Sequence, residues 1–320
     1  MNGFVNTIDE LGEREFAKQY FGKSLTEYYD DSVTILTTGA LRNFPSLSRV
    51  VLPNCSSIIT SAFYECKNLS YISLPNLMSF YDYSKSIAGI FAGTGVNSID
   101  LIPKYYSSYI PVGCFRSCNF SGTLSIPGKY TMIGESAFQS NPIEKLVIEH
   151  SCSVFANAFA YCVDLKEVSA PGLKSVAASA FERCGMLETF FAPELSGAIP
   201  VACFSNCSAL TNVTNFEKVT GVYTGAFFGC RNLPSISFRV ASTILSSVFY
   251  GCSALSVIYI GSDTCTLSTS YAFQSTKITF ATGSIYVPAS RVDYYRNSTN
   301  WNWFSTQIKG YDYENDRPVD

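Results

Sequence analysis

Cysteine has the clearest chemical potential in this 320-residue chain, because a thiolate can act as a nucleophile or bind zinc. Twelve cysteines are present, and two pairs, Cys114 with Cys118 and Cys203 with Cys207, share a CxxxC spacing. Zinc sites usually use tighter spacings such as CxxC, often together with histidine. The pairs are therefore weak evidence for a metal site, and we expect neither a metal nor another cofactor.

Histidine offers a second possible chemistry, since a Cys/His or Ser/His/Asp device needs an imidazole as its base. His150 is the only histidine, and it stands in VIEHSC close to Cys152. Closeness in sequence does not by itself make a catalytic pair. The glycine-rich stretch GIFAGTG (residues 89–95) lacks the GK[ST] ending of a phosphate-binding loop. We predict no catalytic residue, and a hydrolase that uses His150 is the least favoured hypothesis.

A repeat explains the cysteines better than catalysis does. Six segments align without gaps on the pattern small-Phe-x-x-Cys-x-x-Leu-x-x-apolar, and looser copies between them give a period of about 23 residues. The aligned segments are AFYECKNLSYI (62–72), AFAYCVDLKEV (158–168), AFERCGMLETF (180–190), CFSNCSALTNV (203–213), AFFGCRNLPSI (226–236) and VFYGCSALSVI (248–258). Cys114 and Cys203 fall on the small-residue position, so register alone accounts for both CxxxC pairs. The predicted ladder of buried structural thiols is Cys66, Cys118, Cys162, Cys184, Cys207, Cys230 and Cys252.

Each repeat contains the parts of a stacked coil. The LxxIxLP end alternates as a short strand does, and a proline often closes it. An Ile, Val or similar residue stands five residues before the Phe, and the small residue and the Phe fit one short helical turn that points inward. One such unit cannot bury its apolar side chains alone, so stacked units must share a continuous core. We therefore predict an α/β repeat solenoid of about eleven repeats, capped at both ends.

The repeats resemble the BspA-type leucine-rich repeat of bacterial surface proteins, in which the unit reads SIG..AF..C..L..I.IP. The resemblance covers about residues 32–288, and the closing stretch from TCTLSTSYAF to NWNWF also fits it. The chain departs from the pattern near residues 94, 141 and 276, where the cysteine is missing, and in the long segment 76–90. The resemblance implies a right-handed leucine-rich-repeat coil with a binding or adhesion role, often at a cell surface. It implies no catalytic residues.

The sequence divides into three parts on this basis. Residues 1–39 are the expected N-terminal helical cap and leading segment, residues 40–288 the repeats, and residues 289–320 a C-terminal cap with an acidic tail. A capping box at residues 7–10 predicts a helix over residues 7–21. A second short helix is expected around Val292 and Tyr295.

The last residues are expected to close the solenoid. Trp301, Trp303 and Phe304 could cover the apolar face of the last coil. The tail GYDYENDRPVD (310–320) is expected to be loose, with its acidic side chains in solvent rather than around a metal.

Composition excludes some classes of partner. Charged residues make up 15% of the chain and the net charge is −3, so no nucleic-acid footprint is visible. The sequence lacks an apolar run of about 18 residues, so no membrane span is expected. No apolar signal-peptide core is visible near Met1, which leaves two options: the protein is not exported by this route, or the chain is a trimmed form of a longer one. A monomer is expected.

The outward side of the predicted strands is the best candidate for binding, because solenoids bind through regular, rigid rows of side chains. The candidate contact residues are Tyr71, Ser73, Glu167, Ser169, Thr189, Phe191, Asn212, Thr214 and Tyr259. Phe191 and Tyr259 are the best anchors, since exposed aromatic residues often carry interface energy.

These observations favour a non-enzymatic binding or adhesion protein that presents a Ser/Thr/Tyr-rich surface to a protein or glycan partner. It is expected at a bacterial cell surface or as a secreted protein. The alternative is a structural or receptor-binding component of a phage-like particle or other assembly, or a cytoplasmic protein.

Overall fold

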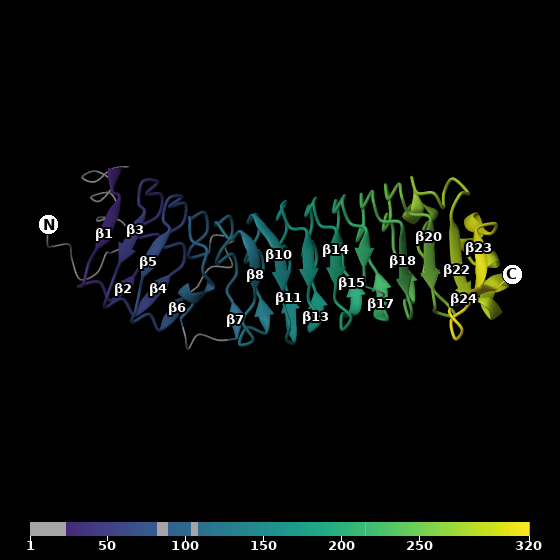
Figure 1. The fold of residues 1–320 in the computed structure, drawn as a ribbon, viewed down its shortest axis with the longest axis horizontal. Coiled ribbons are helices and arrows are strands. Elements are labelled where there is room, and N and C mark those ends of the chain that lie inside the picture. The colour runs from purple at the N-terminus through teal and green to yellow at the C-terminus, as the bar shows by residue number, and fades with distance from the viewer. Residues whose placement is uncertain (1–23, 82–88, 104–107, 215, 320) are drawn as a thin grey trace. The chain divides into compact units, whose positions relative to one another are not determined.

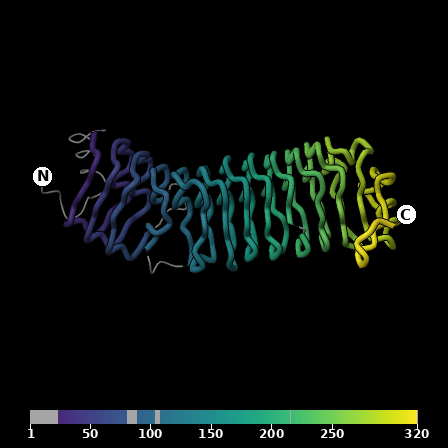
Figure 2. Tube along the Cα trace, in the orientation of Figure 1, coloured from purple at the N-terminus to yellow at the C-terminus, as the bar shows by residue number. Residues whose placement is uncertain are grey.

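The computed structural model describes residues 24–81, 89–103, 108–214 and 216–319. It divides into two compact units: unit one comprises Met1–Gly122 and Lys129–Pro142, and unit two comprises Thr123–Gly128 and Ile143–Asp320. Within each unit the chain forms a β-solenoid whose coils follow one another in chain order (Figures 1 and 2). The predicted repeat solenoid is therefore confirmed.

One side of the coils, which we call face A, is built from the predicted LxxIxLP strands. In unit one these strands are β1 (Glu27–Tyr29), β3 (Arg49–Val51) and β5 (Tyr71–Ser73), paired in parallel. In unit two the corresponding strands are β8 (Gly122–Ser125), whose first residue belongs to unit one, β10 (Ile143–Val147), β12 (Glu167–Ser169), β14 (Thr189–Phe191) and β16 (Asn212–Val213). A further sheet of unit two completes face A of that unit: β18 (Ser235–Phe238), β20 (Val257–Ile260), β22 (Ser284–Pro288), β23 (Ile308–Asp312) and β24 (Arg317–Val319).

A second strand in each coil forms face B, which the sequence did not predict as strand. In unit one face B contains β2 (Ile35–Leu36), β4 (Ser57–Ile59), β6 (Ser79–Tyr81), β7 (Tyr109–Ile110) and β9 (Met132–Ile133). In unit two it contains β11 (Cys152–Val154), β13 (Leu173–Val176), β15 (Ser196–Ile199), β17 (Lys218–Val222), β19 (Thr243–Ile244) and β21 (Thr266–Leu267). The Ile or Val five residues before the Phe is the buried residue of these strands, as Ile58 and Ile199 show.

The third side of each coil carries the Phe. The expected helical turn is present at Phe273 as the 3-10 turn η3 (Ser270–Phe273), whereas the turns around the other repeat phenylalanines of the described coils are not helical. Ser179 and Arg183, two residues before and after Phe181, have φ of 56° and 60°, a conformation that cannot continue a helix. Their N–H groups instead point to the next coil, where Ser179 N donates to Val201 O at 3.0 Å and Arg183 N donates to Ser205 O at 2.8 Å. Phe181 N donates to Cys203 O at 3.0 Å between them. The turn is therefore a third hydrogen-bonded ladder between coils.

A glycine substitution tests the backbone of this ladder. Gly251 has φ of 75° and donates to Gln274 O at 2.9 Å, and an added Cβ would meet nothing closer than 3.8 Å. We expect Gly251→Ala to lower the free energy of unfolding by about 1 kcal/mol through the left-handed conformation alone. The control is exposed Gly128, which lies outside the positive-φ region with open space around it, and Gly128→Ala should cost nothing. Equal urea midpoints for the two variants would contradict this reading.

Stacked phenylalanines fill the core. In unit two the ring centroids of consecutive repeat phenylalanines are 5.6 Å apart for Phe159 and Phe181, 5.7 Å for Phe181 and Phe204, and 5.2 Å for Phe204 and Phe227. In unit one, Phe63, Phe91, Phe115 and Phe138 form the same stack at 5.5–5.7 Å. These rings are fully buried, so each of these repeats contributes a large apolar side chain to the core of its own unit.

The repeat cysteines are buried, and several of them also donate hydrogen bonds. Cys184, Cys207, Cys230 and Cys252 each donate from Sγ to the main-chain oxygen of the Phe in the preceding coil, at 3.0–3.2 Å. Where the cysteine is missing at residue 141, Asn141 takes its place and donates to Phe115 O at 2.7 Å. The position therefore requires a small side chain with a donor, which explains the departure from the pattern. All twelve cysteines are buried, and none forms a disulfide in the described structure.

The C-terminal residues are more ordered than expected. The predicted helix is confirmed as α2 (Val292–Asn297), preceded by the 3-10 turn η4 (Ala289–Arg291). In η5 (Trp301–Phe304), Trp301 and Phe304 are buried against Phe273 of η3 (Ser270–Phe273), with ring centroids 6.1 Å and 5.3 Å away. Trp303 is 74% exposed, so its predicted covering role is wrong.

The acidic tail is not loose. Residues 308–319 form the hairpin of β23 and antiparallel β24, and the Asp312 carboxylate accepts N–H bonds from Glu314 and Asn315 at 3.1 Å. The predicted helix over residues 7–21 lies outside the described residues. In the part of the chain that the structure describes, no helix has the length and apolar character needed to cross a bilayer.

Candidate functional site

Face A carries all nine predicted contact residues, but it does not bring them into one cluster. On three neighbouring strands of unit two, the register places Glu167 beside Thr189 and Thr189 beside Asn212, with Ser169 beside Phe191 in the next row. Thr214 follows directly after β16. Tyr71 and Ser73 lie in unit one on β5, and Tyr259 lies on β20 of the other sheet. All nine side chains are exposed or half-buried.

Many polar side chains of the coils already bind the structure itself. Glu167 pairs with Lys145 on the adjacent strand at 2.8 Å. The Thr214 hydroxyl accepts from Ala192 N at 2.8 Å and donates to Phe190 O at 3.3 Å, so it replaces part of the strand ladder. Side chains of other coils donate to carbonyls of the preceding coil in the same way: Asn68, Asn76, Ser208, Thr211, Ser242 and Ser256. Part of the Ser/Thr-rich surface is therefore occupied by hydrogen bonds between coils.

Exposed aromatic rings remain on face A. Phe191 is 51% exposed and Tyr71 is 47% exposed, and the Arg49 guanidinium lies 3.9 Å from the centre of the Tyr71 ring. Tyr259 is half-buried and stacks on Tyr286 at 5.2 Å. Phe191 is thus the most exposed aromatic ring on the described face A strands of unit two.

The tyrosines around Tyr259 were missed by the sequence reasoning. Tyr286 is aligned with Tyr259 in the sheet, and Tyr311 packs edge-on against both rings at 5.1 Å and 5.5 Å. The alternating stretch SIYVP (284–288) could have indicated Tyr286, because it continues the outward row by one strand. Tyr311 lies in the tail that was expected to be loose.

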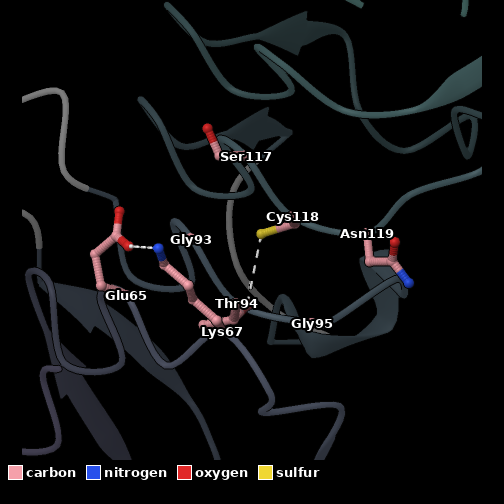
Figure 3. Close-up of a pocket in the computed structure, with 8 residues that line it drawn as sticks. All are labelled: Glu65, Lys67, Gly93, Thr94, Gly95, Ser117, Cys118 and Asn119. Atoms are coloured by element: carbon pink, nitrogen blue, oxygen red, sulfur yellow. Dashed lines mark hydrogen bonds and ion pairs between the residues drawn. The ribbon is translucent and has the colours of Figure 1, made fainter. Parts of the chain in front are cut away.

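A polar cavity of about 510 Å³ opens in unit one between three successive coils (Figure 3). Glu65 and Lys67 form one wall, with Lys67 Nζ 3.6 Å from Glu65 Oε2. Ser117, Cys118 and Asn119 form the opposite wall. Gly93 and Gly95 lie in the coil between them and contribute no side chain. A Cβ on Gly93 would lie 2.9 Å from a Glu65 carboxylate oxygen, so the cavity depends on this glycine. The stretch GIFAGTG therefore has a packing role that its sequence did not reveal.

The cysteine in this cavity is unsuited to nucleophilic chemistry. Burial raises the pKa of the Cys118 thiol to about 11, and Sγ donates to Phe91 O at 2.9 Å. The thiol is therefore protonated near neutral pH, whereas a nucleophilic cysteine needs its thiolate. Burial likewise raises the pKa of Cys152, the cysteine near His150, to about 11. Neither thiol has the environment of a catalytic cysteine.

A second cavity of about 300 Å³ lies in unit one beside β5, the last strand of its sheet. Tyr71, Asn97 and Asp100 are among its lining residues. The 3-10 turn η2 (Ile99–Leu101) stands where a further strand would be expected. The cavity therefore lies between the face A strand β5 and this irregular coil.

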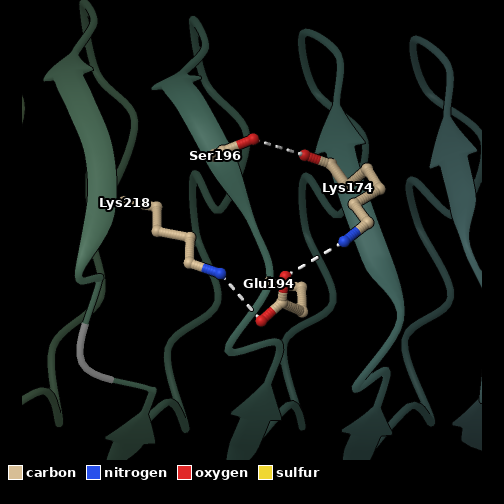
Figure 4. A network of polar contacts seen from close by, with 4 residues as sticks. All are labelled: Lys174, Glu194, Ser196 and Lys218. Atoms are coloured by element: carbon tan, nitrogen blue, oxygen red, sulfur yellow. Dashed lines mark hydrogen bonds and ion pairs between the residues drawn. The ribbon is translucent and has the colours of Figure 1, made fainter.

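Charged side chains on face B form a network across three coils of unit two (Figure 4). The Glu194 carboxylate accepts from Lys218 at 2.8 Å and from Lys174 at 3.0 Å, and all three side chains are 42–49% exposed. Lys218 and Lys174 lower the pKa of Glu194 from its ordinary value of 4.5 to about 2. The network links coils in the same way as the Ser and Asn side chains do.

The Glu194 network predicts a pH-dependent effect on stability. Because its folded-state pKa is lowered, the contribution of Glu194 is complete above pH 4.5 and is lost as the pH falls through about 2. We expect Glu194→Gln to lower the melting temperature slightly at pH 7, with the difference from wild type vanishing near pH 2. Glu217→Gln, an exposed carboxylate in the same unit, is the control and should change little. A difference that is the same at both pH values would contradict the assignment.

Comparison with known proteins places the fold. The family profile described as BspA type leucine rich repeat region matches in six copies, over residues 4–90, 34–166, 85–207 and 174–300. No curated protein matches the chain.

Three solved bacterial structures resemble the chain in fold. A leucine-rich repeat protein from Bacteroides ovatus is 19% identical, with 88% of each chain covered and a TM-score of 0.39. A leucine rich cell surface protein from Faecalibacterium prausnitzii is 19% identical over 88% of this chain and 90% of that chain, with a TM-score of 0.44. A leucine-rich repeat protein from Eubacterium ventriosum is 17% identical over 80% and 85%, with a TM-score of 0.48. Since the family profile matches nearly the whole chain, this protein belongs to the BspA-type leucine-rich repeat family.

Proposed function

We propose that this protein is a non-enzymatic scaffold at a bacterial cell surface that binds a protein partner through face A. The observation that carries the proposal is Phe191, an apolar ring half exposed on a sheet where nearby Glu167 is ion-paired and nearby Thr214 is hydrogen-bonded. Membership of a family of bacterial surface proteins supports the location. The raised pKa values of Cys118 and Cys152 support the absence of cysteine catalysis.

A protein partner fits face A better than a glycan does. Sugars stack on the open face of an aromatic ring, but Arg49 covers one face of the Tyr71 ring, and Tyr259 and Tyr286 stack on one another. A partner meets at most one open face of each ring, together with its edge and hydroxyl group. Partly exposed Tyr, Phe and Arg side chains are the residues that protein interfaces favour.

The proposal is tested by probing the purified chain against an array of extracellular proteins and an array of glycans. We expect saturable binding to a member of the protein array and none to the glycan array. The same preparation is assayed for hydrolysis of polysaccharide and protein polymers. Binding restricted to glycans would overturn the choice of partner, and hydrolysis that is lost in His150→Ala would overturn the non-enzymatic assignment.

A further inference from the structure

The face A sheet of unit one ends at β5 in the described residues. Its order is β1-β3-β5, and the next described coil contributes the turn η2 in place of a strand. On its β3 side, β5 is fully engaged: Tyr71 N donates to Ser48 O at 3.2 Å, and Ser73 O accepts from Leu52 N at 3.0 Å. The other edge of β5 faces the coil that contains η2.

Ile72 directs its main-chain groups to that other edge. In a parallel sheet, neighbouring residues of a strand bond alternately to the strands on either side. Since Tyr71 and Ser73 bond toward β3, the N–H and C=O of Ile72 point away from it. Ile72, Tyr71 and Asp100 all line the cavity of about 300 Å³ described above, so this donor and acceptor face a space next to the sheet.

The residues that line the cavity carry formal charge of one sign only, which is negative. Among the residues that line it, Asp100 is the only one with a formal charge at neutral pH, and its side chain is exposed. The Tyr71 ring stands between this cavity and β3, where Arg49 already contacts it at 3.9 Å from the ring centre. A basic side chain on the cavity side could contact the same ring and Asp100 together.

We propose that the cavity beside β5 binds an extended peptide segment of the partner, which adds as a parallel strand to Ile72 and places an Arg or Lys between Tyr71 and Asp100. This inference rests on the proposed function, because it assigns a contact site for the same protein partner. The register follows that of β3, where Arg49 lies beside Tyr71 and Val50 beside Ile72. In the added strand, the residue beside Ser73 donates its N–H to Ile72 O.

The probe is a fluorescein-labelled peptide with the sequence LSRVVLP, that of residues 47–53, which has the required Arg-Val-Val pattern. Anisotropy titration of the full chain is expected to show saturable binding. The same peptide N-methylated at its second valine keeps its charge and side chains but loses the donor to Ile72 O. We expect it to bind about tenfold more weakly, the effect of one main-chain hydrogen bond.

A charge exchange tests the role of Asp100. We expect the Asp100→Lys variant to bind the Arg peptide about tenfold more weakly than wild type does. The same variant is expected to bind the corresponding Glu peptide, LSEVVLP, more tightly than wild type does. Glu135→Lys is the matched control, because Glu135 is an exposed acid of unit one outside the cavity lining, and it should leave both affinities unchanged. Melting temperatures of both variants are compared with wild type to exclude unfolding.

Several outcomes overturn the inference. Equal affinity of the N-methylated peptide rules out strand addition, and equal weakening by Asp100→Lys and Glu135→Lys rules out a local contact with Asp100. Absence of binding at millimolar peptide rules out the site. Because the peptide experiment leaves Phe191 untouched, its failure would leave a positive result on the protein array standing.

Discussion

Replacing Phe204 by alanine is expected to lower the free energy of unfolding by about 4 kcal/mol, within the range for a large aromatic residue in a core. The side chain is fully buried between Phe181 and Phe227, at centroid distances of 5.7 Å and 5.2 Å, and Phe190 packs edge-on at 4.7 Å. The surrounding backbone is held by three ladders, so the coil has little freedom to collapse into the cavity.

Two further variants serve as controls for this prediction. Phe204→Leu keeps much of the volume and should cost less than half as much. Phe191→Ala removes a phenylalanine that is 51% exposed in the same unit, and it should cost about 0.5 kcal/mol or less. Urea unfolding is followed by the fluorescence of Trp301 and Trp303, which both lie in unit two. A similar cost for Phe204→Ala and Phe191→Ala would contradict the stacked core.

Replacing Cys207 by alanine is expected to lower the free energy of unfolding by about 2 kcal/mol, more than the loss of one small apolar atom. Cys207 Sγ donates to Phe181 O at 3.1 Å in a fully buried position. Alanine leaves the carbonyl without this donor, and the buried site gives water no access to replace it.

Serine separates the hydrogen bond from the packing. Cys207→Ser keeps a donor at the same position and should cost less than Cys207→Ala, although oxygen is smaller and more polar than sulfur. If the thiol acted only as a small hydrophobe, the order would be reversed, because a buried hydroxyl costs more than a methyl group. Serine more destabilising than alanine in urea titrations would therefore refute the donor role.

Much of the fold can be predicted from the sequence because the same buried positions recur from repeat to repeat. The positions of Phe204 and Cys207 recur in register, so their burial follows from the need to stack units. The strands of face B were missed because the Ile or Val before the turn is their one recurring residue, as in β7 and β15, whereas the face A strands repeat a longer LxxI pattern. The left-handed residues of the turn were missed because Arg183 has no intrinsic preference for φ of 60°. Hydrogen bonds between coils impose it.

The candidate site was less predictable for a related reason. Alternation along a strand shows which side chains point outward, and this placed Phe191 and Tyr71 on face A. Alternation does not show which polar groups are already hydrogen-bonded to a neighbouring coil. The Thr214 hydroxyl is one of them, because it accepts from Ala192 N at 2.8 Å. The cavities of unit one depend on side chains that are missing in a coil between two others, as at Gly93, and a pattern of present residues does not reveal them.

Under the proposed function, scaffold and binding roles fall on different residues of one repeat. The positions that recur, such as Cys207 and Phe204, hold the coils together from inside. The positions that vary, such as Phe191, lie on face A and are free to differ without loss of the fold. A partner recognised through face A would then be specified by the variable positions alone.

The most direct test of this claim measures how tightly two surface variants bind the partner protein that the array identifies. Phe191→Asp places a charge on face A, whereas Phe155→Asp makes the same change at a ring with 41% exposure that follows β11 of face B. With melting temperatures matched to wild type, we predict that Phe191→Asp weakens binding at least about tenfold, the effect of losing an interface anchor, and that Phe155→Asp binds as wild type does. Unchanged binding by Phe191→Asp, or equal weakening by both variants, would contradict the assignment of binding to face A.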